Sequence, residues 1–239
     1  MHKFIKHHSV YRIDILLVPV QAILYQVISI MNSVGKSISI LLGYGNGQFH
    51  NQKIHSTGLD AFFVAVGDFN EDKELDLAIT SWDNNRISLI FGKGNGTFQS
   101  HTIYPIDLSP TSVIAGDLNN DTHIDLVAAN TDNHTVSILL RNGDGTFQNQ
   151  KMYVTGDGSY FVTIGDVNED SKMDLVVVNT YSSSISVLLG NGDGSFQEQV
   201  IYTVGLLPRA AAIGTFRDQT KLHLAIINTF ESSLVNTCP

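Results

Sequence analysis

A repeat of 49 residues constrains this 239-residue chain more than any other feature of its sequence. The clearest markers are phenylalanines that close short glycine-rich turns, and they stand at Phe49, Phe98, Phe147 and Phe196. Two further sets keep the same step: the glycines Gly67, Gly116, Gly165 and Gly214, and the polar residues Asn32, Ser81, Asn130, Asn179 and Asn228. A period held without insertion predicts a repeat architecture, in which each repeat is one supersecondary unit.

Each period reads as short strands separated by turns. Between Thr111 and Tyr153 the segments TSVIAGD, IDLVAAN, TVSILLR and TFQNQKMYV are rich in β-branched and aliphatic residues, and NGDG between the last two is a hairpin turn. No segment shows a sustained helical period. Four antiparallel strands per repeat, packed radially so that both faces of each sheet are covered, predict an all-β fold, a β-propeller. A parallel β-helix is the alternative, but its repeats are usually shorter.

The repeat length predicts a single propeller domain of five blades over residues 1–239. The repeats run over about 18–66, 67–115, 116–164 and 165–213, and the last, 214–239, is closed with 1–17. In this arrangement the N-terminus supplies a strand beside residues 232–236, which removes exposed sheet edges. The alternative is an incomplete larger ring, a fragment of a seven-bladed propeller.

The apolar segment IDILLVPVQAILYQVISIM, residues 13–31, has two interpretations. It resembles a signal peptide or a membrane anchor, because it is long and basic residues precede it. It is also consistent with a degenerate strand pair of the repeat. Asp14, Gln21 and Gln26 interrupt the apolar run, which favours the strand pair.

Charge and cysteine content exclude several classes of protein. The net charge of −9, with no basic stripe, argues against nucleic-acid binding. The one cysteine, Cys238, allows neither an internal disulfide nor a cysteine-rich zinc site.

Much of the negative charge lies in three loops that recur at the same 49-residue step, GDFNEDKELDLAI, GDLNNDTHIDLVA and GDVNEDSKMDLVV. Each loop has side-chain oxygens at positions 1, 3, 5 and 9 and a backbone carbonyl near position 7. The predicted ligands are Asp68, Asn70, Asp72, Glu74 and Asp76; Asp117, Asn119, Asp121, His123 and Asp125; and Asp166, Asn168, Asp170, Lys172 and Asp174, with Glu74, His123 and Lys172 acting through the backbone carbonyl. Oxygen ligands in a flexible loop suit Ca²⁺, so we expect about three Ca²⁺ sites.

Asp and Asn also favour turns without any metal. Three copies in register argue against that simpler explanation, and so does the contrast with the other two periods. There the matching positions carry no set of oxygen ligands: Thr215, Arg217, Gln219 and His223 in one, Pro19, Gln21, Ile23 and Val27 in the other. We expect no metal site in those periods.

These loops, together with hairpins such as LLGNGDGSF, resemble the FG-GAP repeats of integrin α-type propellers, also called VCBS-type repeats. The resemblance covers about residues 36–239 and keeps the family's order of glycine turn, loop and strands. It implies Ca²⁺-binding blades and, commonly, extracellular adhesion or recognition. This chain departs from the family in its two ligand-free repeats and its short length.

In a propeller the acidic loops and glycine hairpins share one face, and the remaining loops form the other. These remaining loops differ between repeats, and recognition loops are free to diverge in this way. We therefore predict a protein or glycan partner on this variable face, with Trp82, Asp83, Arg86, Tyr181 and Arg209 as candidate contacts. The alternative for Trp82 is simple packing at a blade edge.

Enzyme signatures such as HExxH, GxSxG or a P-loop are absent from the sequence. We therefore expect a non-catalytic Ca²⁺-stabilised propeller used extracellularly for adhesion or recognition. The alternatives are a carbohydrate-binding lectin of similar architecture, and an accessory domain of a larger extracellular enzyme.

Overall fold

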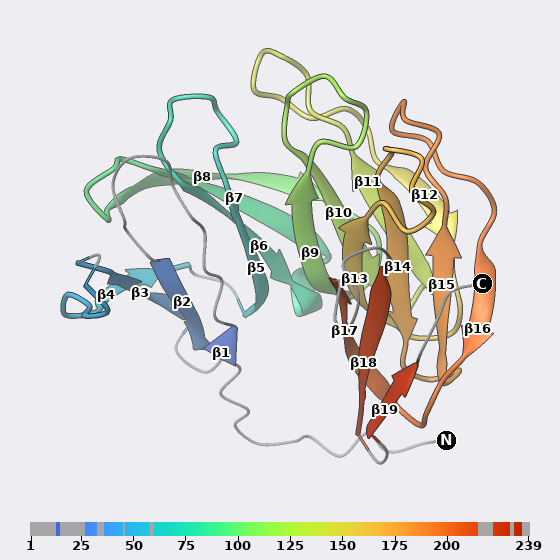
Figure 1. Ribbon diagram of the computed structural model, residues 1–239. Coiled ribbons are helices and arrows are strands. Elements are labelled where there is room, and N and C mark those ends of the chain that lie inside the picture. The colour runs from blue at the N-terminus through green and yellow to red at the C-terminus, as the bar shows by residue number, and fades with distance from the viewer. Residues whose placement is uncertain are drawn as a thin grey trace.

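The computed structural model describes residues 13–14, 27–32, 36–44, 46–57, 60–214, 222–229 and 232–235. It contains five antiparallel sheets, each with its strands in chain order. The sheets follow one another around the molecule, from blue to red in Figure 1. The predicted β-propeller of four-stranded blades is thus confirmed in its architecture.

The strands of the five sheets have the following bounds. The first sheet contains β1 (Ile13–Asp14), β2 (Val27–Asn32), β3 (Ser37–Leu42) and β4 (Lys53–Ser56). The second contains β5 (Ala61–Gly67), β6 (Asp76–Ser81), β7 (Arg86–Gly92) and β8 (Phe98–Pro105), with the 3-10 turn η1 (Trp82–Asn84) between β6 and β7. The third contains β9 (Pro110–Gly116), β10 (Asp125–Asn130), β11 (Thr135–Leu139) and β12 (Lys151–Val154). The fourth contains β13 (Ser159–Gly165), β14 (Asp174–Asn179), β15 (Ser184–Leu188) and β16 (Val200–Thr203). The fifth contains β17 (Pro208–Gly214), β18 (His223–Asn228) and β19 (Ser232–Val235).

The segment 13–31 forms strands at both ends, because β1 pairs antiparallel with β2 in the first sheet. Among the described residues no helix is long and apolar enough to cross a membrane. The predicted strand within 1–12 lies outside the described residues, and so does its pairing with the last strand. The ligand-free loop positions 19, 21, 23, 215, 217 and 219 lie outside them too.

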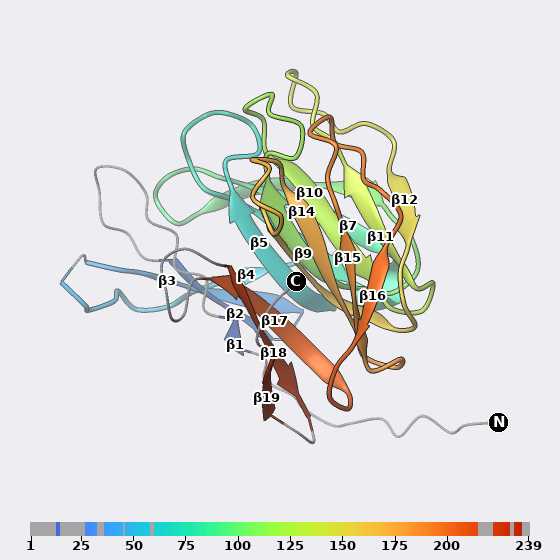
Figure 2. The ribbon, with the colours of Figure 1, turned by 45° about the vertical axis from the view of Figure 1, so that its right-hand side comes forward.

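The core lies between neighbouring sheets rather than within a single layer. Ile38 of β3 packs in one cluster with Val64 of β5, and Val136 of β11 packs in another with Val162 of β13. Comparable clusters join the second sheet to the third and the fourth to the fifth. Each large aliphatic side chain buried in this way contributes roughly 1.5–3 kcal/mol. The first strands β5, β9, β13 and β17 lie next to one another on the inside, and fourth strands such as β12 and β16 lie on the outside (Figure 2).

Aromatic pairs join the outer strands β8 and β12 to the hairpin of the following sheet. Tyr104 of β8 meets Phe147 edge-on at a centroid distance of 5.3 Å, and Tyr153 of β12 meets Phe196 at 5.6 Å. The backbone N–H of Phe196 also donates to the Tyr153 hydroxyl, at 3.1 Å. The repeated phenylalanine of the glycine hairpin therefore serves the interface with the preceding sheet.

Candidate calcium loops and the opposite loop face

The three acidic loops connect the first and second strands of the second, third and fourth sheets. Each loop has two non-glycine residues in the left-handed region, at positions 4 and 6. These are Glu71 and Lys73, Asn120 and Thr122, and Glu169 and Ser171, with φ between 59° and 72°. The left-handed conformation costs an ordinary residue roughly 1–2 kcal/mol, so a shared geometry repeated three times indicates a defined loop rather than a loose turn.

In the first loop the side chains at positions 1, 3 and 5 turn inward. The N–H of Asp72 donates to Asp68 Oδ1 and to Asn70 Oδ1, both at 3.1 Å, so these two oxygens lie next to each other. Asn70 Nδ2 donates to Asp72 Oδ2 at 3.0 Å. At position 7, the N–H of Glu74 donates to Asp72 Oδ1 at 2.8 Å.

The second and third loops repeat these contacts. The N–H of Asp121 donates to Asp117 Oδ1 and Asn119 Oδ1, both at 3.2 Å. In the third loop the N–H of Asp170 donates to the matching oxygens of Asp166 and Asn168, at 2.9 and 3.2 Å. The N–H groups of His123 and Lys172 at position 7 repeat the contact with position 5, at 2.8 and 3.0 Å. The structure thus brings positions 1, 3 and 5 together in every loop.

The aspartate at position 9 of each loop also accepts hydrogen bonds from the backbone of two segments. Asp76 is fully buried, and its Oδ2 accepts the N–H of Phe69 at 2.8 Å while its Oδ1 accepts the N–H of Gly92 at 2.8 Å. Asp125 accepts the N–H groups of Leu118 and Arg141, and Asp174 those of Val167 and Gly190. Each position-9 carboxylate therefore ties its loop to the glycine-rich hairpin on the same face.

Burial raises the pKa of Asp76 and of Asp125 to about 6. The negative charges of the two other carboxylates in each loop also raise this pKa, whereas the hydrogen bonds from backbone N–H groups lower it. The pKa of Asp174 is raised for the same reasons. A cation is the species that would relieve both the desolvation and the mutual repulsion of these groups.

In each acidic loop, only part of the predicted set of oxygen donors is gathered as a metal ion would need it. Among the described residues no group of three or more His, Cys, Asp or Glu side chains is gathered as a metal site. The composition of the loop accounts for this result, since position 3 is a carboxamide and position 7 offers a backbone carbonyl. The third carboxylate, at position 9, is held by backbone N–H groups. The oxygen donors at positions 1, 3 and 5 suit Ca²⁺, which accepts mixed carboxylate, carboxamide and carbonyl ligands.

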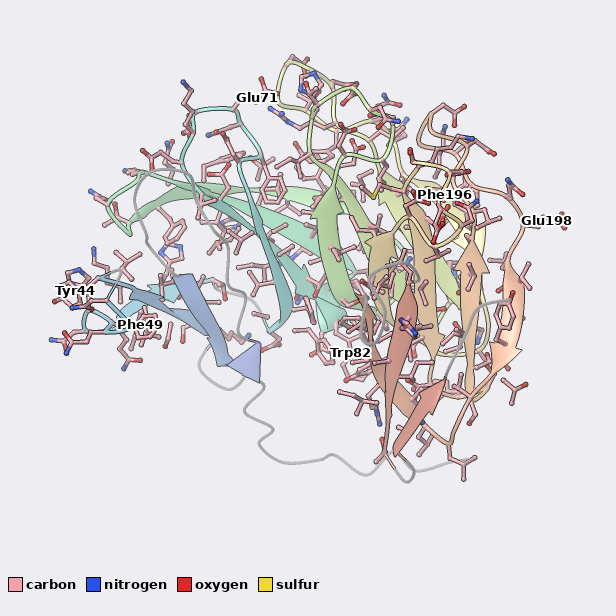
Figure 3. All side chains as sticks on the ribbon, in the orientation of Figure 1. Tyr44, Phe49, Glu71, Trp82, Phe196 and Glu198 are labelled. Atoms are coloured by element: carbon pink, nitrogen blue, oxygen red, sulfur yellow. The ribbon has the colours of Figure 1, made fainter. Side chains whose placement is uncertain are left out.

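A polar contact between two of these loops escaped the sequence-based prediction. Glu71, at position 4 of the first loop, accepts a hydrogen bond from Arg141 Nη1 at 2.7 Å and pairs with His123 Nδ1. The Arg141 side chain is buried, and its hydrogen bond is the main cause that lowers the pKa of Glu71. The predicted metal ligand at His123 is its backbone carbonyl, and its side chain in addition joins two blades. Glu71 and Trp82 mark the opposite loop faces in Figure 3.

On the variable face, four side chains form a row of successive contacts, and three of them come from the first strands β5, β13 and β17. Arg209 lies over the Tyr160 ring at 4.7 Å, and Tyr160 meets Phe62 edge-on at 6.1 Å. Phe62 in turn lies 6.1 Å from Trp82, which is 39% exposed. Three sheets therefore contribute to one aromatic and cationic row.

β-Bulges produce this row. The pairing register of the innermost strands shifts between Ala61 and Phe63, and again between Ser159 and Phe161 and between Pro208 and Ala210. The skipped residues are Phe62, Tyr160 and Arg209, and a bulge re-aims the side chain that it leaves unpaired. Phe62 and Tyr160 were missed by sequence reasoning, although stepping back from Arg209 by 49 residues leads to Tyr160 and, after two more steps, to Phe62.

The other predicted contacts are Tyr181, Asp83 and Arg86. Tyr181 is 55% exposed, and its ring and backbone lie against Gly158, where an added Cβ would come within 2.6 Å. Asp83 is exposed within η1, and Arg86 is half-buried at the start of β7. The structure thus brings two of the five predicted contacts, Trp82 and Arg209, into the same row.

Comparison with known proteins agrees with this architecture. The FG-GAP-like repeat family matches twice, over residues 68–128 and 117–177. A search of curated proteins finds no match. Among solved structures, a functionally unknown protein from Desulfotomaculum acetoxidans matches with a TM-score of 0.62 and 11% identity, over 88% of this chain and 61% of its own.

Two further structures match at a similar level. BBS1N, solved in complex with ARL6DN, has a TM-score of 0.62 and 13% identity over 91% of this chain and 62% of its own. A lectin from Agrocybe aegerita, described as recognising non-reducing terminal N-acetylglucosamine, has a TM-score of 0.56 and 15% identity over 84% of this chain and 57% of its own. The chain spans about three fifths of the length of these structures. Residues 68–177 thus match the FG-GAP-like repeat family, and the chain has a β-propeller-like fold.

Proposed function

We propose that this protein is a non-catalytic, calcium-binding propeller that acts as an extracellular adhesion or recognition module. The observation that carries the proposal is the shared geometry of the three acidic loops, with their left-handed residues at positions 4 and 6 and inward-turned oxygens at positions 1, 3 and 5. Bound Ca²⁺ would neutralise the crowded carboxylates there. The position-9 aspartates would pass this ordering to the glycine hairpins, because they join the two loops of each sheet.

Calorimetric titration with Ca²⁺ tests the metal sites directly. We expect about three sites, and we expect Asp72→Ala, Asp121→Ala and Asp170→Ala each to remove one. Ligand that binds only the folded state stabilises it by about 2.7 kcal/mol at a concentration 100 times its Kd, so a chelator should lower the Tm clearly. Absence of binding up to millimolar Ca²⁺ would mean that the loops are turns alone, and would remove the basis for the extracellular proposal.

Recognition of a partner is proposed for the variable face. The row formed by Phe62, Trp82, Tyr160 and Arg209 supports this placement, because aromatic rings and arginine dominate the binding energy of many protein interfaces. The same aromatic surface suits stacking of a sugar ring, which supports carbohydrate binding as the second candidate function. Glycan-array binding that free sugar competes away would favour that candidate. Loss of partner binding in Trp82→Ala would support the placement, and unchanged binding would contradict it.

A further inference from the structure

A cavity of about 750 Å³ lies between the first sheet and the second, beside their glycine hairpins. Its lining is largely apolar, with buried Ile40 and Leu77 and the rings of Phe49 and Phe98. A second cavity of about 420 Å³ adjoins it and shares Lys53 and Phe98 in its lining. The larger volume falls within the range of roughly 300–1,000 Å³ that is typical of small-molecule sites.

The chain departs from its own repeat at this interface. His55 pairs here with Phe98 at 5.2 Å, whereas a tyrosine occupies the matching position in the following sheets, at Tyr104 and Tyr153. The imidazole is shorter than a phenol, and it carries no hydroxyl to reach the next hairpin in the way that Tyr153 does. The substitution leaves space between the two sheets.

Two more departures face the same space. Tyr44 stands where the later hairpins have Lys93, Asn142 and Asn191, and His50 stands where they have Gln99, Gln148 and Gln197. The Tyr44 and His50 rings lie 3.7 Å apart, and Tyr44 is 55% exposed. Figure 3 shows Tyr44 and Phe49 near each other at the outer end of the first sheet. These changes add aromatic surface to the cavity.

The side chains that line the cavity carry a net positive charge, whereas the whole protein is negative. Its lining includes three lysines, Lys53, Lys73 and Lys93, against one carboxylate, Glu74, although the chain has a net charge of −9. Lys53 Nζ reaches across the cleft to donate to the backbone carbonyl of Asn95 at 2.6 Å. The Glu74 carboxylate lies against Gly94, where an added Cβ would come within 2.4 Å of it. An anionic group at the rim would find lysine donors.

We propose that this cleft binds a small amphipathic anion, with an aromatic or aliphatic body against the apolar floor and a carboxylate, sulfonate or phosphate group at the lysines. The site uses neither the side-chain oxygens at positions 1, 3, 5 and 9 of the acidic loops nor the variable face, so it goes beyond the function proposed above. Lys73 and Glu74 belong to the first acidic loop, which forms one wall of the cleft.

A pair of fluorescent probes tests the proposal on the full chain in Ca²⁺-containing buffer. The anionic probe is 8-anilinonaphthalene-1-sulfonate, and the neutral one is N-phenyl-1-naphthylamine, which has the same aromatic body. We expect saturable binding of the anion and roughly tenfold weaker binding in the double variant Lys53→Gln/Lys93→Gln, because each exposed charge pair contributes up to about 1 kcal/mol. Binding of the neutral probe should stay within about twofold of its original affinity in that variant.

Matched variants localise the effect. Lys151 occupies the repeat position of Lys53 two sheets later, on the exposed outer strand β12, so Lys151→Gln should leave both affinities unchanged. Tyr44→Ala should weaken both probes, since it removes part of the aromatic wall. The proposal is overturned by non-saturable binding of the anion, by equal loss of both probes in the lysine double variant, or by an equal effect of Lys151→Gln.

Discussion

Asp125 shows how one carboxylate can serve both the fold and a cation site. It is fully buried, and its two oxygens accept backbone N–H groups from the acidic loop and from the hairpin, at 3.0 and 2.8 Å. Asp121 of the same loop is exposed, and its hydrogen bonds with the described residues stay within the loop. The two aspartates are therefore expected to respond differently to the same substitution.

We predict that Asp125→Ala lowers the free energy of unfolding by about 1–3 kcal/mol even in chelator, because two buried N–H groups lose their acceptor. Asp121→Ala should change the stability of the metal-free protein little and should cost Ca²⁺ binding instead. Urea unfolding in chelator, compared with Ca²⁺ calorimetry, separates the two effects. Equal stability of the two variants in chelator would show that the position-9 contacts are not structural.

The sequence predicted these residues as ligands but not the structural role of position 9. Positions 1 to 7 contact one another within the loop, so spacing alone brings them together. The partner of Asp125 in the hairpin, the N–H of Arg141, lies 16 residues further along the chain, and strand pairing determines that contact.

At the scale of elements, some contacts between neighbouring blades occur in one repeat and have no counterpart among the described residues of the others. Glu71 bridges to Arg141 and His123 of the next blade, and Arg141 stands where the first, second and fourth hairpins have Gly43, Gly92 and Gly190. The buried guanidinium depends on Glu71 for its charge partner. An unpaired buried cation is strongly unfavourable.

Glu71→Ala should therefore lower the Tm, because it leaves the Arg141 cation unpaired between two blades. The matched control is Glu169→Ala, at the same position two repeats later, where the side chain is exposed and has no hydrogen-bond or ion-pair partner among the described residues. Thermal unfolding followed by circular dichroism measures both variants. A similar change in the two Tm values would contradict a role for the inter-blade pair.

Local and long-range features differed in how well the sequence predicted them. The strands, hairpins and loops follow from alternation, glycine turns and the 49-residue step, all of which are local signals. Glu71 and Arg141 are 70 residues apart, and the row around Phe62 and Tyr160 depends on bulges that shift the pairing register. The sequence of a single strand predicts neither this ion pair nor these register shifts.

At the scale of the whole molecule, three acidic loops on one face should make stability depend jointly on pH and Ca²⁺. The raised pKa values of Asp76, Asp125 and Asp174 mean that the folded chain takes up these protons at higher pH than the unfolded chain. Through these groups, the metal-free protein becomes more stable as the pH falls from about 7 towards about 4. Protons then also compete with Ca²⁺ for the same carboxylates.

We predict that the Tm difference between the Ca²⁺-loaded and metal-free protein narrows as the pH falls through about 6. Calorimetric unfolding at a fixed free Ca²⁺ concentration, between about pH 7.5 and about pH 5, measures the change. A difference that stays constant down to about pH 5 and closes only near pH 4 would indicate carboxylates with ordinary pKa values instead.

The pairing of Tyr104 and Tyr153 with the hairpin phenylalanine of the next sheet also defines where such a chain can be shortened or extended. Tyr153 and Phe196 belong to consecutive sheets, so a sheet removed from the array leaves one ring of a pair without its cover. Shortening or lengthening the protein by whole 49-residue units keeps the tyrosine–phenylalanine pairs between the remaining sheets. The ring at the new end has no following sheet to pair with. A modular propeller engineered from these repeats would therefore need a terminal unit whose exposed ring is replaced by a polar side chain.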